Sequence, residues 1–244
     1  MKFAVINWVS AIFCALLAAG VLTLCWFEYG SWEFIWLLAL CAIISLPVCA
    51  LLHELGHALF GLFSKIRAKI SLSSLLSFFK PSSCEIIPRT DINVKNRLIA
   101  TASGGLAVNA LFVIFGIIAV AVAQIPAYLA IIAPASLYLL IINLLPFETG
   151  NGKTDGLLIC ELVKNEDCAT VMLAVLTVQA QVLNGKPIAE VDEKLLFDMP
   201  QLPEDDPSFV ILTDLRRQYC EAVGDTERAQ FYARRFEEIK EYLN

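Results

Sequence analysis

Four long apolar runs lie within residues 1–156 of the chain, and three of them contain no charged residue. The second is interrupted only by Glu33 near its start and by the sequence HELGH near its end. Each run is about as long as the roughly 20 residues that cross a bilayer as a helix. None has the charged face that a helix in a water-soluble bundle would need. The pattern therefore predicts four transmembrane helices, over Ala4 to Phe27, Trp32 to Phe63, Leu98 to Gln124 and Ala127 to Phe147.

Residues 157–244 have a different pattern, because acidic residues outnumber basic ones and no run is long enough to cross a bilayer. Glycine and proline break this part at residues 184–187 and 199–207. The segments between the breaks predict helices over Gly156 to Lys164, Asp167 to Leu183, Ile188 to Phe197, Ser208 to Val223 and Thr226 to Leu243. We therefore predict two domains, a transmembrane domain over residues 1–156 and a cytoplasmic acidic helical domain over residues 157–244.

The last two of these helices contain the sequence YCEAVGDTERAQFYARRFEEI, which resembles a tetratricopeptide repeat. A plain helical hairpin that packs its own core is the alternative interpretation of this sequence.

The segment Ser64 to Arg97 is rich in lysine and arginine, whereas the two loops on the opposite side contain neither. The positive-inside rule places this basic segment in the cytoplasm. With four spans, both termini are then cytoplasmic. Within the segment, Lys69 to Pro88 predicts short strands. The expected fold is an α-helical integral membrane protein with a small membrane-surface β element and a cytoplasmic all-α, tetratricopeptide-like domain.

Composition supports the membrane assignment, because 58% of the residues are hydrophobic and the mean hydropathy is +0.68. Ordinary soluble domains contain about 45–50% apolar residues. The chain has eight cysteines, but no C-x-x-C pair and no spacing typical of a zinc-binding set. We expect no disulfides, since half of the cysteines lie in spans and the others face a reducing cytoplasm.

Both histidines of the chain lie in the sequence HELGH, at residues 53–57. Residues four apart share one face of a helix, so His53 and His57 can bind the same metal ion. Glu54 is placed to accept a proton from water, as the general base of a zinc metalloprotease does. Three ionisable groups inside an apolar helix are costly unless they have a function or a partner. This cost argues against a merely structural histidine pair.

A catalytic zinc ion usually has three protein ligands and a water molecule, so the pair needs a third ligand. No other histidine exists, and the ligand must lie at the cytoplasmic edge of the membrane. The fourth apolar run ends at that edge in the sequence NLLPFETGNGKTDG, residues 143–156. Its GKT lacks the earlier glycine of a phosphate-binding loop. We predict that this loop brings Asp155 to the metal, with Glu148 as the competing candidate.

These motifs together resemble the site-2 protease family of intramembrane zinc metalloproteases. The likeness rests on H-E-x-G-H in one span, a later N-x-x-P and then Asp-Gly, and it covers roughly residues 40–160. The resemblance implies that His53, His57 and Asp155 bind Zn²⁺ and that Glu54 is the catalytic base. One departure is the distance of nine residues from Pro146 to Asp155, because family members usually place Asp-Gly a few residues after the proline.

The resemblance also implies substrate-binding residues. Asn143 of the N-x-x-P motif would hold the substrate backbone, or else satisfy a carbonyl group freed where Pro146 breaks the helix. Gly105 and Asn109 belong to a G-x-x-x-N segment of the third span and would line a substrate path. Leu106 stands where the family usually has proline. Close packing of helices through small residues is the alternative role for this segment.

The expected function is an intramembrane zinc metalloprotease that cleaves transmembrane or membrane-associated peptides near the cytoplasmic edge. The chain suits a bacterial plasma membrane. Its expected partners are the lipid bilayer, a membrane-embedded protein or peptide substrate, and a cytoplasmic protein bound by the C-terminal domain. We expect no nucleic acid.

Two other functions are weighed against the protease. A non-catalytic membrane adaptor with a decayed protease fold would present the helical tail to partners, but it has no use for Glu54 beside both histidines. A zinc-carrying or metal-sensing membrane protein would need more polar residues along its spans.

Overall fold

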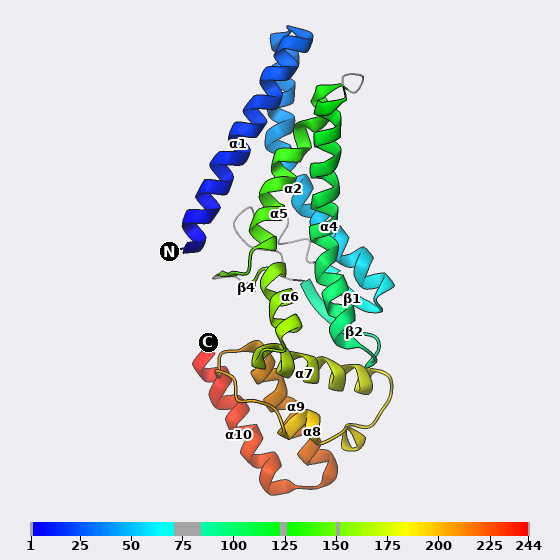
Figure 1. The fold of residues 1–244 in the computed structure, drawn as a ribbon. Helices are drawn as coiled ribbons and strands as arrows, with labels where there is room; N and C mark the ends of the chain where they lie inside the picture. The colour runs from blue at the N-terminus through cyan, green and yellow to red at the C-terminus, as the bar shows by residue number, and fades with distance from the viewer. Residues whose placement is uncertain (1, 71–83, 123–125, 150–151, 244) are drawn as a thin grey trace. The chain divides into compact units, whose positions relative to one another are not determined.

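The protein is described by a computed structural model, which covers residues 2–70, 84–122, 126–149 and 152–243 (Figure 1). The chain forms two compact units. The first consists of Met1–Leu62, Ala68–Glu85 and Ala100–Ile159, and the second of Phe63–Arg67, Ile86–Ile99 and Cys160–Asn244.

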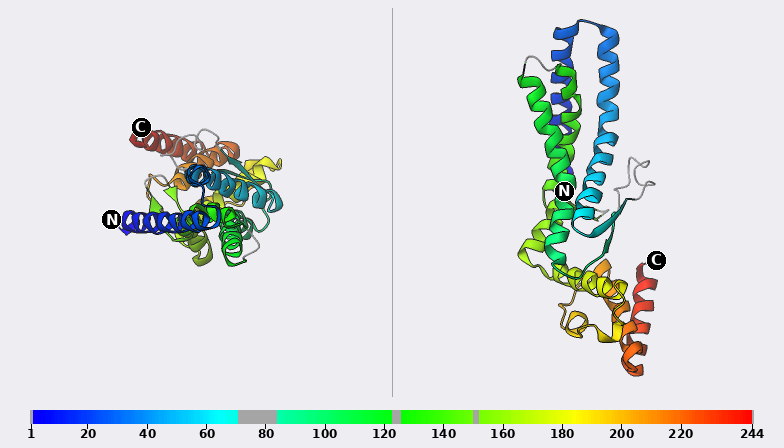
Figure 2. Two further views of the ribbon diagram at one scale, coloured as in Figure 1. Left: turned by 90° about the horizontal axis from the view of Figure 1, so that it is seen from above. Right: turned by 90° about the vertical axis from the view of Figure 1, so that its right-hand side faces the viewer.

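Among the described residues, four helical segments are long and apolar enough to cross a membrane, as predicted. Figures 1 and 2 show long helices running alongside one another in the first unit. Large apolar side chains such as Phe27, Trp36 and Ile43 are 72% to 80% exposed on them, which suits a lipid environment. The segments are α1 (Lys2–Tyr29), α2 (Trp32–Phe63), α4 (Val94–Ala121), and η1 (Ala127–Ile132) followed by α5 (Ala133–Leu144).

The fourth segment differs from the single helix predicted over Ala127 to Phe147. It begins as the 3₁₀ helix η1 and becomes α-helical only at Ala133. Pro134 has no N–H and cannot donate the α-helical hydrogen bond to the residue four positions earlier, which explains the change. The helix ends at Leu144, two residues before Pro146, because the residue preceding a proline disfavours the helical conformation.

An apolar and aromatic cluster holds one end of the helices together. Val21, Cys25 and Leu38 are buried there with residues of α4 and η1. Around them, the ring centroids of Phe34 and Tyr29 lie 4.7 Å apart, and those of Trp26 and Trp32 lie 4.4 Å apart. The aromatic residues lie around the loop between α1 and α2, which lacks lysine and arginine. Such rings are typical of the membrane–water interface.

Helices α2 and α4 approach each other closely at Gly56 and Gly104. A Cβ atom added at Gly56 would lie 2.6 Å from the carbonyl oxygen of Gly104, and one added at Gly104 would collide with the carbonyl oxygen of Gly56. Larger residues would push the helices apart, as in other small-residue helix contacts in membranes. Since Gly56 lies inside HELGH, this contact sets the distance between the motif and α4.

Short strands occur in two places. Strands β1 (Ile66–Ile70) and β2 (Cys84–Pro88) form one two-stranded sheet, in agreement with the predicted β element, while residues 71–83 lie outside the described residues. Strands β3 (Glu148–Thr149) and β4 (Gly152–Lys153) pair antiparallel, with Glu148 opposite Lys153. This second hairpin lies within the loop that the sequence predicted would carry a metal ligand.

Most of the second unit is helical and has an apolar core of its own. The helices α7 (Asp167–Leu183), α9 (Pro207–Val223) and α10 (Thr226–Leu243) have the bounds that were predicted, apart from one residue at the start of α9. Val171, Val178 and Leu212 are fully buried between them. The preceding helix, α6 (Asp155–Lys164), and α7 are together apolar enough for a span but bend by 91°. Because α7 packs its apolar face into this core, we assign it to the helical domain.

The predicted helix over Ile188 to Phe197 is wrong, since the structure has a short 3₁₀ helix η2 (Ile188–Glu190) and a single turn α8 (Lys194–Phe197). Val191 between them is extended, and its side chain is buried in the apolar core. Asp192 Oδ1 then accepts a hydrogen bond of 3.1 Å from the backbone N–H of Lys194, which favours a new helix start.

The second unit also includes the beginning of α4. Lys95 Nζ donates a hydrogen bond of 2.7 Å to Asn165 Oδ1, and Gln181 Nε2 donates one of 3.2 Å to Asp91 Oδ2. The tail therefore packs with part of the basic segment rather than forming a unit from residues 157–244 alone.

Candidate metal centre

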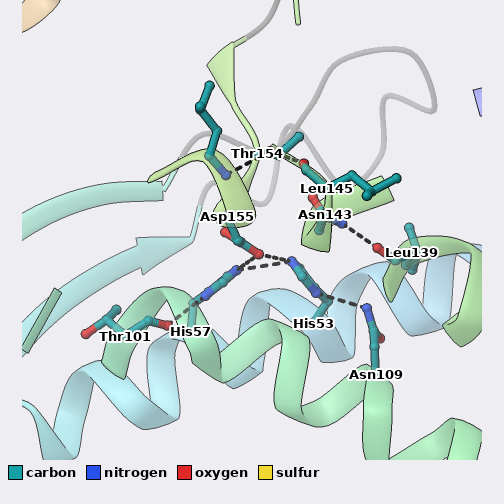
Figure 3. Close-up of polar contacts among 10 residues, drawn as sticks. His53, His57, Thr101, Asn109, Leu139, Asn143, Leu145, Thr154 and Asp155 are labelled. Carbon is teal, nitrogen blue, oxygen red and sulfur yellow. Dashed lines mark hydrogen bonds and ion pairs between the residues drawn. The ribbon is translucent and has the colours of Figure 1, made fainter. Parts of the chain in front are cut away.

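The two histidines of HELGH lie one turn apart on α2, with their rings turned toward each other (Figure 3). The Nε2 atoms of His53 and His57 are 3.1 Å apart. Both residues are buried, at 5% and 7% exposure. The helix spacing that suggested a shared metal ion is therefore accompanied by side-chain positions that direct both nitrogens to one point.

Asp155 completes a triangle with these two nitrogens. Its Oδ2 atom lies 3.2 Å from His53 Nε2 and 3.4 Å from His57 Nε2. Burial acts to raise the pKa of the Asp155 carboxyl group, but the two imidazoles beside it hold that pKa below its ordinary value. Of the two predicted candidates for a third ligand, Asp155 is the one that the structure brings to the histidines, whereas Glu148 is an exposed residue of β3.

Thr154 fixes the position of Asp155 by capping α6. Its Oγ1 accepts hydrogen bonds from the backbone N–H groups of Leu157 (3.3 Å) and Phe147 (3.1 Å), and donates one to the carbonyl oxygen of Leu145 (2.7 Å). The cap begins α6 at Asp155 and ties that start to the end of α5. A threonine just before an acidic helical residue is a helix-start signal that the sequence contained and our prediction did not use.

The glycine of Asp-Gly has a steric role at the same place. A Cβ atom at Gly156 would collide with the carbonyl oxygen of Leu144. The first turn of α6 thus lies directly against the last turn of α5, which brings the neighbouring Asp155 to the depth of the histidines.

The unusual distance between Pro146 and Asp155 is explained by the β3–β4 hairpin. The backbone N–H of Thr154 donates a hydrogen bond of 3.1 Å to the carbonyl oxygen of Phe147, so the chain leaves and returns at nearly the same point. Between these two points the chain forms two short antiparallel strands, in which Glu148 pairs with Lys153. The extra residues are therefore accommodated without moving Asp155 away from the end of α5.

Residues of α4 contact the other side of both imidazoles. His57 Nδ1 lies 2.9 Å from the carbonyl oxygen of Thr101, and His53 Nδ1 lies 3.0 Å from Nδ2 of the fully buried Asn109 (Figure 3). A Cβ atom at Gly105 would lie only 2.6 Å from His53 Cε1 and from His57 Nε2. Because no larger residue fits at Gly105, α4 can lie directly against the two rings.

The remaining predicted site residues lie near this group. Glu54 follows His53 on α2 and is half-buried. Asn143 is also half-buried, and its Nδ2 donates a hydrogen bond of 3.0 Å to the carbonyl oxygen of Leu139 on its own helix. This bond fits the role of satisfying a helix carbonyl, while substrate contacts by Asn143, Gly105 and Asn109 remain predictions.

The three ligand atoms fit a zinc ion. Zinc bound at about 2.0–2.1 Å by three corners of a tetrahedron keeps these ligand atoms about 3.3 Å apart. The observed separations are 3.1, 3.2 and 3.4 Å. Asp155 Oδ2 is buried and, apart from the two histidine nitrogens at 3.2 and 3.4 Å, has no hydrogen-bond partner among the described residues, as expected for an oxygen that binds a cation. The Thr101 carbonyl also requires His57 Nδ1 to carry the proton, which leaves Nε2 with a free lone pair.

Comparison of the chain with protein-family models, with curated proteins and with solved structures finds no match.

Proposed function

We propose that this protein is an intramembrane zinc metalloprotease of the site-2 type. The observation that carries the proposal is the buried triangle of two imidazole nitrogens and one carboxylate oxygen, with the spacing of a zinc site and a glutamate next to one of its histidines. A soluble metalloprotease would carry such a group in a polar cleft. Here both histidines lie on a helix that is long and apolar enough to cross a membrane, and Asp155 follows the end of another such helix.

In the proposed mechanism, His53, His57 and Asp155 would hold a zinc ion, which would supply the positive charge that makes water a nucleophile at neutral pH and polarises the peptide carbonyl. Glu54 accepts a proton from the attacking water as the new C–O bond forms at the peptide carbon. It then delivers that proton to the amide nitrogen as the C–N bond breaks, so that a carboxylic acid and an amine leave the site.

Two features support a site near the cytoplasmic edge of a plasma membrane. The histidines lie close to the end of α2, directly before the basic segment that the positive-inside rule assigns to the cytoplasm. Asp155 follows the end of the last span. Substrates are then transmembrane or membrane-associated peptides cut close to that edge, and both termini are cytoplasmic.

The β3–β4 hairpin accounts for the one spacing that departs from the pattern of site-2 proteases. The nine-residue distance between Pro146 and Asp155 departs from the family pattern, yet the hydrogen bond between Thr154 and Phe147 closes the extra loop. Asp155 of the second motif can therefore bind the same metal ion as the two histidines of the first motif, despite the longer loop between Pro146 and Asp155.

The C-terminal helical domain is proposed to bind a cytoplasmic protein. The helices α9 and α10 form a hairpin around Gly224, whose backbone φ of 80° suits glycine. Arg228 and Arg216 stack on the ring of Phe197, at 5.7 and 5.8 Å from its centroid. The acidic composition of residues 157–244 favours a basic partner.

The decisive experiment measures zinc per chain in the detergent-purified protein. We expect one tightly held zinc ion, which is lost in His57→Ala and in Asp155→Ala. Glu148→Ala is the matched control, because it removes a carboxylate from the same loop but not from the triangle, and it should retain zinc.

Catalysis is then tested with Glu54→Gln, which keeps the shape of the side chain but cannot take the proton. It should hold zinc as wild type does and cleave a reconstituted single-span test peptide about 10²–10⁴-fold more slowly. If the folded wild-type protein binds no zinc, the protease hypothesis is rejected and the membrane-adaptor hypothesis stands. If zinc is lost in Glu148→Ala and kept in Asp155→Ala, the third ligand is Glu148 and not Asp155.

A further inference from the structure

The two histidines are held by partners of different chemistry. The backbone carbonyl of Thr101 can only accept a hydrogen bond, so His57 Nδ1 must donate. The partner of His53 is the side-chain amide of Asn109, which has a donor end and an acceptor end. The tautomer of His57 is therefore determined by the backbone, whereas that of His53 depends on which end of the amide faces it.

The buried side-chain amide of Asn109 is unfavourable at this position unless it serves His53. Its side chain is fully buried within α4, and its Oδ1 has no hydrogen-bond partner among the described residues. Burying an amide group away from water is unfavourable unless its polar atoms form hydrogen bonds. Among the described residues, the contact of 3.0 Å between Nδ2 and His53 Nδ1 is the hydrogen bond of this side chain that offsets the cost.

The orientation with Nδ2 against His53 suits a site without metal. The imidazole then accepts through Nδ1 and carries its proton on Nε2, from which it can donate to Asp155 Oδ2 at 3.2 Å. A ligand nitrogen, in contrast, must have its lone pair free, so binding of a metal through Nε2 requires the proton on Nδ1. Half a turn about the Cβ–Cγ bond of Asn109 exchanges the two ends of its planar amide and offers Oδ1 as the acceptor.

We propose that Asn109 is a positioning residue that supports both tautomers of His53, accepting from Nδ1 through Oδ1 in the metal-loaded site and donating to Nδ1 through Nδ2 in the metal-free site. The inference rests on the metal site of the proposed function. It assigns the two histidines different parts: His57 is ready for the metal at all times, and His53 becomes ready when the amide turns. It also replaces the substrate contact predicted for Asn109, because a fully buried amide behind His53 does not reach a substrate.

The test compares Asn109→Leu, which has a similar shape but no hydrogen bond, with Asn109→Asp, which can only accept. Asn7→Leu is the matched control, since it removes another intramembrane amide, one that accepts from Tyr138 Oη. Zinc affinity is measured in the full-length, detergent-purified protein by competition with a chelator. Size-exclusion profiles and thermal unfolding establish that each variant is folded.

We expect zinc binding to weaken by about 10–100-fold in Asn109→Leu, as for other groups that orient a metal-binding histidine. Asn109→Asp should bind zinc at least as well as wild type, because its carboxylate supports only the metal-binding tautomer. Asn7→Leu should match wild type. A purely structural role for Asn109 would instead lower thermal stability in both Asn109 variants without separating their zinc affinities.

A direct readout is available because the chain has only two histidines. In protein labelled with ¹⁵N in histidine, protonated and unprotonated ring nitrogens have different chemical shifts. We expect zinc to move the proton of His53 from Nε2 to Nδ1 in wild type, while His57 keeps its proton on Nδ1. In Asn109→Asp, the His53 proton should be on Nδ1 before zinc is added.

If Asn109→Leu has the zinc affinity and the His53 signals of wild type, the inference about Asn109 is overturned and the proposed function is unaffected. A raised KM for a cleaved peptide with zinc affinity unchanged would also overturn the inference, and it would return Asn109 to the substrate path. A folded wild-type chain that binds no zinc would overturn the proposed function and this inference with it.

Discussion

Single residues around the two imidazoles leave little room for substitution. The carbonyl of Thr101 holds His57, the amide of Asn109 holds His53, and Gly105 leaves just enough space for both rings. Each of these contacts comes from α4 and acts on the orientation of a ring rather than on the stability of the helix. Small changes at these positions are therefore expected to alter metal binding before they unfold the protein.

We predict that Gly105→Ala removes most of the bound zinc from a folded protein. The added Cβ would lie 2.6 Å from His53 Cε1 and His57 Nε2, closer than carbon atoms approach without displacement, so the rings must move. Gly20→Ala on α1 is the control, because no other atom lies within 4 Å of its added Cβ. Zinc content and helical circular dichroism are measured for both, and a fully zinc-loaded Gly105→Ala protein would contradict the packing described.

At the scale of elements, the site depends on how α6 starts beside the end of α5. The side chain of Thr154 joins three backbone groups of this junction, and Gly156 lets the two helices touch. The β3–β4 hairpin extends from the junction without contributing a ligand. The position of Asp155 should therefore depend on the cap and not on the length of the hairpin.

We predict that replacing Glu148–Lys153 with Asn-Gly leaves zinc affinity unchanged. The hydrogen bond from Thr154 N–H to the Phe147 carbonyl would then close an ordinary β-turn with two central residues, for which Asn-Gly is well suited. In contrast, Thr154→Val keeps the shape of the side chain but removes the cap. It should cost about 1 kcal/mol of stability and weaken zinc binding. Equal zinc loss in both variants would show that the hairpin itself positions Asp155.

At the scale of the whole molecule, a bundle with exposed apolar side chains and a helical unit with its own buried core occur in one chain. The two have opposite relations to solvent, since lipid can cover the exposed apolar surface of the first but is not needed by the second. The acidic tail and the basic segment Ser64 to Arg97 carry most of the charged residues of the chain, whereas the four apolar helices carry few.

We predict that both termini face the cytoplasm. A fluorescent protein fused after Asn244 should fluoresce, and alkaline phosphatase fused there should be inactive, because that enzyme needs an oxidising compartment for its disulfides. Fusions after Gly30, in the loop without lysine or arginine, should behave in the opposite way. Active phosphatase after Asn244 would reverse the orientation and place the site at the other face.

By itself, the sequence determined the elements whose signals are local. The apolar spans follow from run length, the tail helices from glycine and proline breaks, and the histidine pair from helical spacing, because each depends on residues close together in the chain. The two exceptions differ in kind. The helix predicted over Ile188 to Phe197 is interrupted at Val191, which is extended and buried in a core formed by distant residues, whereas Pro134 is a local signal that changes the start of α5.

The tertiary structure alone decided which atoms meet. Asp155 and Glu148 were both open to the sequence because they share one loop, and only the capped start of α6 brings Asp155 within 3.2 Å of His53 Nε2. Likewise, the partners that hold the imidazoles lie 44 and 56 residues further along the chain. Such contacts depend on how closely α2 and α4 approach at Gly56 and on the direction of each side chain, neither of which spacing along the chain can specify.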